Sequence, residues 1–155
     1  MSPSASNEQI LVHLILEKFD RLCATVNDVP DVLINSCLPV EGSNSPVQIL
    51  VHCCGMMRRW SSTVNLGIKV PRDRDAEFSA RMSKPEVLKL ALETRAAFAA
   101  DISFTTMEQA PAVLPSGREI EYWMATCKGV LMHVYEELCQ HLGHLEITRD
   151  FLRRP

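Results

Sequence analysis

The sequence predicts an all-α fold, a four-helix bundle with two crossover connections, formed by a single domain over residues 1–155. Three kinds of observation indicate this fold. Helix-start signatures recur along the chain, apolar residues at spacings of three and four follow them, and no segment has the pattern of a strand. Only 6 residues are glycine and 6% are aromatic, which argues against a turn-rich β-sandwich or barrel.

The first two helices have clear start signals. Ser6 and Gln9 match a capping box, in which the two side chains satisfy open amide donors, and the helix is expected over about residues 7–26. Ser45 and Pro46 begin the second helix, with proline at the first helical position, where its missing N–H costs nothing. The apolar pattern of this helix continues to Gly67, a natural stop.

The last two helices differ in how well their starts are defined. A capping box of Ser83 and Glu86 begins the third helix, whose apolar pattern reaches Ile102. The fourth and longest helix starts somewhere between Glu119 and Thr126 and continues almost to the end of the chain. The linkers of about 12 to 20 residues exceed those of an up-down bundle, and two crossover connections would explain them.

Composition narrows the classes of function. The 16 Lys+Arg against 19 Asp+Glu give a formal charge of −3, so no nucleic-acid partner is expected. No apolar run approaches the roughly 20 residues of a membrane span, and the N-terminus lacks the basic and apolar regions of a signal peptide. The six cysteines include no CxxC motif, and we interpret them as reduced thiols of a cytoplasmic protein.

A candidate metal site involves two of the predicted helices. His133, Glu137 and His141 stand four residues apart and therefore form one stripe on the last helix. His52 interrupts an apolar run of the second helix, where a buried imidazole needs a polar partner. Zinc binds imidazole nitrogen and carboxylate oxygen, and His52 with Glu137 and His141 has the composition of a three-ligand catalytic site.

The same residues also have a plainer interpretation. Histidine and glutamate at a spacing of four can be a solvated helix face with a weak ion pair, and His52 can be a core histidine bonded to a carbonyl. The strong helical zinc motif H-E-x-x-H is absent. Spacing alone therefore leaves both interpretations open.

Three segments resemble a known family. Residues 133–150 (HVYEELCQHLGHLEITRD) resemble the last helix of the DinB-like superfamily. Residues 51–60 (VHCCGMMRRW) and 71–78 (PRDRDAEF) resemble its mycothiol-dependent branch, the mycothiol S-transferases and mycothiol-dependent maleylpyruvate isomerases. The resemblance covers nearly the whole chain and is strongest over the helices of His52 and of Glu137 and His141.

The resemblance implies a metal-dependent enzyme. It assigns metal-ligand roles to His52, Glu137 and His141, and it implies a divalent metal, usually zinc but sometimes nickel or another ion. It also implies mycothiol as co-substrate, a small electrophile as second substrate, and often a homodimer. No side chain beyond the metal ligands is assigned a catalytic role.

Five further residues are candidates for supporting the metal or contacting substrate. His133 and His144 lie one turn from the predicted ligands, where they would orient a ligand or a water. Arg59 and Arg149 would meet a polar or anionic substrate, and Trp60 would pack in the core or beside the substrate.

The first hypothesis for function is a metal-dependent thiol S-transferase. A free thiol has a pKa of about 8.5 and a coordinated thiol is deprotonated, so a three-ligand centre could activate mycothiol for attack on an electrophilic carbon. Two alternatives remain: a thiol-dependent isomerase, and a non-catalytic metal-binding, stress-associated bundle.

Overall fold

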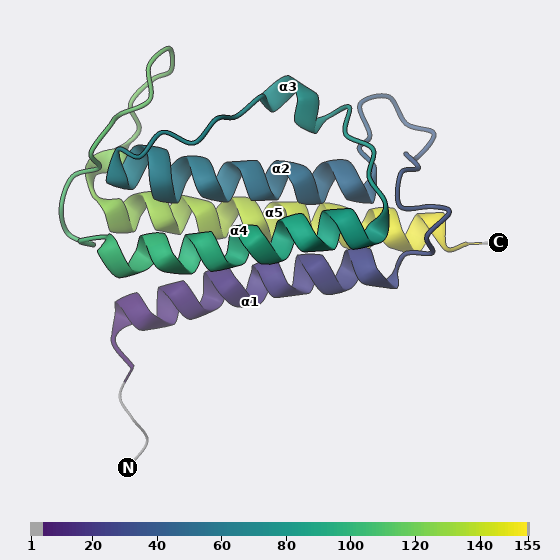
Figure 1. Ribbon diagram of the computed structural model, residues 1–155, viewed down its shortest axis with the longest axis horizontal. Coiled ribbons are helices and arrows are strands. Elements are labelled where there is room, and N and C mark those ends of the chain that lie inside the picture. Colours follow the sequence, from purple (N-terminus) through teal and green to yellow (C-terminus); the bar gives the residue numbers. More distant parts are fainter. Residues whose placement is uncertain (1–4, 155) are drawn as a thin grey trace.

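The four-helix bundle is confirmed. The computed structural model describes residues 5–154, and four long helices pack side by side in it with no strand in that range (Figure 1). The long helices are α1 (Asn7–Asp28), α2 (Pro46–Arg58), α4 (Lys84–Phe104) and α5 (Cys127–Leu152). The core between them contains fully buried side chains such as Phe19, Leu50, Phe98 and Leu138.

Side-chain caps begin all four helices. The Ser6, Ser45 and Ser83 capping boxes form as expected, each with the serine oxygen accepting from a backbone N–H and the Gln or Glu side chain accepting in return. The sequence placed the start of the last helix only between Glu119 and Thr126. The structure has Thr126 as its N-cap, with the hydroxyl oxygen accepting from Gly129 N–H at 3.0 Å.

One connection gives the bundle its topology. Residues 66–83, which include the short helix α3 (Arg74–Glu77), run back along the outside of α2, so α2 and α4 point the same way (Figure 1). The other two linkers, 29–45 and 105–126, join antiparallel helices at the bundle ends. The described chain therefore shows one full-length crossover where two were expected, because linker length alone does not distinguish a crossover from a long end loop.

The second helix differs from expectation in its last part. Residues Arg59–Asn65 form a π-helix (η1) in which backbone hydrogen bonds span five residues rather than four. Buried polar side chains there reach neighbouring helices. Ser61 donates to Asp101 Oδ2 at 2.6 Å, and Asn65 donates to the Cys127 carbonyl at 3.2 Å. Such segments are frequent at functional sites.

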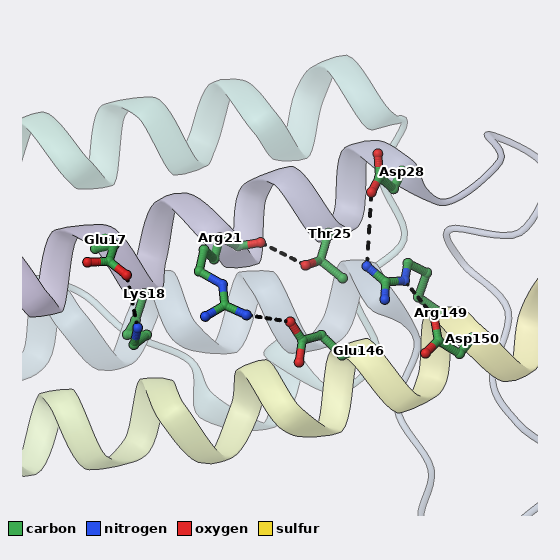
Figure 2. A network of polar contacts seen from close by, with 8 residues as sticks. All are labelled: Glu17, Lys18, Arg21, Thr25, Asp28, Glu146, Arg149 and Asp150. Carbon is green, nitrogen blue, oxygen red and sulfur yellow. Dashed lines mark hydrogen bonds and ion pairs between the residues drawn. The ribbon is translucent and has the colours of Figure 1, made fainter.

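The contact between α1 and α5 carries a row of polar pairs at its edge. Arg21 pairs with Glu146 at 2.9 Å, and Arg149 pairs with Asp150 at 2.8 Å and approaches Asp28 at 4.0 Å (Figure 2). Exposed pairs of this kind contribute about 0–1 kcal/mol each. Apolar burial therefore stabilises this interface, and the ion pairs border it.

None of the helices in residues 5–154 has the length and apolar character needed to cross a bilayer. The expectation that the chain has no signal peptide rests partly on residues 1–4, which lie outside the described residues.

Candidate metal centre

Three predicted ligands meet between α2 and α5. His52, Glu137 and His141 each offer a ligand atom, and these atoms lie within 4.8 Å of one another. Glu137 and His141 lie one turn apart on α5, with 3.8 Å between the carboxylate Oε2 and the imidazole Nε2. His52 faces them from α2, and its ring centroid lies 4.7 Å from that of His141. The structure thus places the three side chains around a common point.

The crossover segment, residues 66–83, passes close to α2 and holds the His52 ring through Glu77. Glu77, at the end of α3, lies with its Oε2 2.8 Å from His52 Nδ1. Arg72 donates to both oxygens of Glu77, at 2.6 and 2.9 Å. Because Nδ1 is engaged by Glu77, the Nε2 atom of His52 is left to bind a cation. A carboxylate that accepts from the distal nitrogen is the usual support of a metal-binding histidine.

Gly55 makes room for this support. A Cβ at position 55 would overlap Glu77 Oε1 and lie 3.0 Å from Arg72 Nε. A glycine inside a helix costs stability relative to alanine, so its position opposite Glu77 has a packing reason. Glu77, Arg72 and Gly55 were not among the predicted site residues. The interior glycine and the resemblance of residues 71–78 were the available signals.

The two carboxylates at the site are held ionised. Burial opposes the ionisation of Glu77, but hydrogen bonds from His52 and Arg72 outweigh it and lower the pKa of Glu77 below its ordinary value. The neighbouring His141 imidazole lowers the pKa of Glu137 below its ordinary value, helped by the nearby His133. An ionised Glu137 is the form that binds a cation.

A cavity opens on one side of the three ligands. Its volume is about 520 Å³, and it is lined by His52, Glu137 and His133, by the Met56 and Trp60 side chains, and by four arginines and two more glutamates. The arginines are Arg59, Arg72, Arg74 and Arg118. The cavity is large enough for a drug-sized ligand. Of the predicted supporting residues, His133, Arg59 and Trp60 therefore border the site.

Two of the residues that line the cavity, Trp60 and His133, belong to an aromatic cluster. The His133 ring stacks on Trp123 with 3.8 Å between centroids, and Trp60 contacts both rings edge-on. His133 Nε2 lies 3.8 Å from Glu137 Oε1, so this imidazole is in position to orient the carboxylate. The third member, Trp123, comes from the 3-10 helix η2 (Tyr122–Ala125) and was not predicted to lie near the site, because only folding brings the loop before α5 against Trp60 and His133.

Two predicted supporting residues lie elsewhere. His144 is exposed on α5, one turn beyond His141, and does not line the cavity. Arg149 lies at the α1–α5 edge, where it pairs with Asp150 (Figure 2). This position provides no support for the predicted substrate contact of Arg149.

The cysteines of the chain are poor candidates for the reacting thiol. All six are free. Burial raises the pKa of Cys54 to about 12 and that of Cys23 to about 11, and it raises the pKa of Cys53 well above its ordinary value. A thiol with so high a pKa is almost entirely protonated at neutral pH and is a weak nucleophile. A thiol that reacts here would therefore come from outside the chain.

This cysteine chemistry makes a testable prediction. Brief treatment of the native protein with iodoacetamide at pH 8 should modify the exposed Cys37 first, and Cys54 should react on the order of a hundredfold more slowly because little of it is thiolate. Peptide mass spectrometry over time measures both rates. Modification of Cys54 as fast as Cys37 in folded protein would contradict the burial described here.

The fold and this site define the class of the protein: a helical bundle with a His–Glu–His candidate metal centre beside a cavity. A sequence model of the mycothiol-S-transferase family, a DinB-like family, matches residues 8–153. The chain therefore belongs to this family, and membership implies mycothiol S-transferase activity. The resemblance noted in the sequence is confirmed. Searches among curated proteins and among solved structures find no match.

Proposed function

We propose that the chain is a zinc-dependent mycothiol S-transferase in which His52, Glu137 and His141 bind the metal. The observation that supports this most is the convergence of their ligand atoms within 4.8 Å. Two imidazoles and one carboxylate form a ligand set of the catalytic zinc type, which leaves a coordination position open. Imidazole also suits nickel, but the tetrahedral preference of zinc favours three protein ligands with one open position.

The surroundings of the three residues support a site that binds metal. The hydrogen bond between His52 Nδ1 and Glu77 Oε2 selects the tautomer whose Nε2 is a ligand. Arg72 in turn holds both oxygens of Glu77. A solvated helix face, the plainer interpretation of these residues, would not require a buried carboxylate behind His52.

The proposed reaction joins the thiol sulfur to an electrophilic carbon. A divalent cation lowers the pKa of a coordinating thiol, so that the sulfur is a thiolate at neutral pH. In a displacement the S–C bond forms, the bond to the leaving group breaks with its electron pair, and the thiol proton goes to solvent. Glu77 and Arg72 hold the His52 ring in place, and Trp60, packed against Trp123, gives the cavity an aromatic surface.

Isomerisation is the second candidate within this class, because reversible addition of a thiol to a double bond would use the same centre. The cavity beside the ligands favours either catalytic function over a non-catalytic metal-binding, stress-associated bundle, since such a bundle needs no space for two substrates. A cytoplasmic, homodimeric enzyme remains part of the proposal.

Metal content and thiol conjugation test the proposal together. The purified wild type should bind about one zinc per chain, and His52→Ala, Glu137→Ala and His141→Ala should each abolish stoichiometric binding. Zinc-loaded wild type should accelerate the reaction of mycothiol with 1-chloro-2,4-dinitrobenzene, with release of chloride. The three ligand variants should not.

His13→Ala is the matched control, because His13 is exposed on α1 and remote from the cavity. It should retain both zinc and activity. Zinc binding unaffected by all three ligand variants would contradict the assigned site. Stoichiometric zinc without conjugation of mycothiol to this electrophile, or to an activated alkene, would favour the non-catalytic bundle.

A further inference from the structure

The four arginines of the cavity differ in how their charges are neutralised. Arg72 is paired with Glu77, and Arg118 is paired with Glu121 at 2.7 Å. Arg59 and Arg74 have no ion pair within residues 5–154. Two cationic side chains on the cavity wall are therefore available to a ligand.

Aromatic rings contact the two unpaired arginines and leave their N–H groups free to donate hydrogen bonds. The guanidinium carbon of Arg59 lies 5.6 Å from the centroid of the Trp60 ring. Arg74 lies at the same distance from the Phe78 ring. A ring face attracts the cation but does not accept its N–H groups as a carboxylate would, so the planar fork remains free to bind an anion.

The positive charges of the four cavity arginines repel one another. Burial lowers the pKa of Arg59, and the neighbouring Arg72, Arg118 and Arg74 lower it further. The one remaining acidic side chain of the wall, Glu119, is exposed on the loop before η2. An anionic ligand would relieve the repulsion among the arginines.

Mycothiol does not account for this charge, since an N-acetylcysteinyl pseudodisaccharide has no anionic group at neutral pH other than its thiolate. The second substrate is then the molecule that matches the arginines. We propose that the cavity selects an electrophile bearing a carboxylate, which Arg59 and Arg74 bind while its reactive carbon faces the candidate metal centre. This inference rests on the proposed function, because it assigns the acceptor of that reaction.

The guanidinium fork matches a carboxylate because two parallel N–H groups can donate to its two oxygens. Substrate positioning of this kind lowers the barrier only for molecules that have the anionic group. The displacement itself is unchanged: the sulfur–carbon bond forms, the carbon–halogen bond breaks, and the halide leaves with the electron pair.

A matched pair of aryl chlorides tests the inference. The probes are 4-chloro-3,5-dinitrobenzoate and its carboxamide, each with mycothiol and zinc-loaded protein, and each rate is divided by the uncatalysed rate. The normalised kcat/KM should favour the carboxylate by about tenfold or more, as one charge-assisted interaction predicts. Arg59→Gln and Arg74→Gln should each remove most of this preference, because each lowers the rate with the carboxylate about tenfold more than the rate with the carboxamide.

Arg153→Gln is the control, because Arg153 is exposed after α5 and far from the cavity wall. Equal normalised rates for the two probes, or arginine variants that lower both rates alike, would overturn the inference while the transferase stands. Acceleration of neither probe nor of 1-chloro-2,4-dinitrobenzene would overturn the proposed function itself.

A binding measurement distinguishes a carboxylate bound by the arginines from a carboxylate bound by the metal. The chain has 2 tryptophans: Trp60 lines this cavity and Trp123 packs against Trp60, so tryptophan fluorescence reports on the cavity. In metal-free protein 4-methylbenzoate should shift the emission more than 4-methylbenzamide, and Arg59→Gln and Arg74→Gln should weaken that response. A response that requires zinc and ignores both variants would place the carboxylate on the metal and contradict the inference.

Discussion

Replacing Glu77 with alanine is expected to weaken zinc binding about 10- to 100-fold, the usual effect of removing a carboxylate behind a metal-binding histidine. The reason is local: His52 Nδ1 loses its partner at 2.8 Å, so the ring loses both its tautomer preference and its orientation. Arg72 loses the acceptor of its two hydrogen bonds and then lies beside the imidazole unneutralised. Competition with a zinc-binding dye measures the change in Kd.

Two other variants show which property of Glu77 matters. Glu77→Gln keeps an oxygen that can accept from His52 Nδ1 but removes the charge that neutralises Arg72, so its affinity should fall between those of wild type and Glu77→Ala. Asp75→Ala changes an exposed carboxylate of the same short helix and should leave the Kd unchanged. A folded Glu77→Ala protein with the Kd of the wild type would contradict this role.

Gly55→Ala should damage the same support from the opposite side. The new methyl group would overlap Glu77 Oε1, so Glu77 or the crossover must move away from α2. Overpacking of this kind costs about 1–3 kcal/mol of unfolding free energy. The displaced Glu77 should also lower zinc affinity in the direction of Glu77→Ala. Urea unfolding and the dye competition measure the two effects.

Gly143→Ala is the matched control on α5. A Cβ there would meet nothing within 4 Å, and alanine is the better helix former by up to about 1 kcal/mol. The control variant should therefore be as stable as the wild type or more stable. If Gly55→Ala behaved in the same way, with unchanged zinc affinity, the close packing of Glu77 against α2 would be refuted.

Local signals in the sequence predicted most of the fold. Three serine capping boxes define helix starts through contacts within four residues, and the apolar spacing that follows defines the buried face. The π-helix after Arg58 could not be predicted in this way, because its buried polar side chains find partners on α4 and α5 only after packing. The direction of the connections likewise depends on which helices become neighbours.

The candidate ligands were predictable for a related reason. Glu137 and His141 share a helix face at a spacing of four, and an imidazole in the apolar run around His52 requires a partner. Glu77 was not predictable from spacing, since the crossover that carries it is irregular and its approach to α2 depends on a missing side chain at Gly55. Of the cavity arginines only Arg59 was predicted, because Arg72, Arg74 and Arg118 lie outside the four long helices and no helical spacing relates them to the ligands.

X-ray absorption at the zinc edge tests the central claim most directly, because it identifies the neighbours of the metal in solution. The zinc-loaded protein should show nitrogen and oxygen neighbours at about 2.0–2.2 Å and no sulfur, and addition of mycothiol should introduce one sulfur at about 2.3 Å. A spectrum with cysteine sulfur before mycothiol is added, or one that mycothiol leaves unchanged, would contradict a centre of two histidines and one glutamate that binds an external thiol.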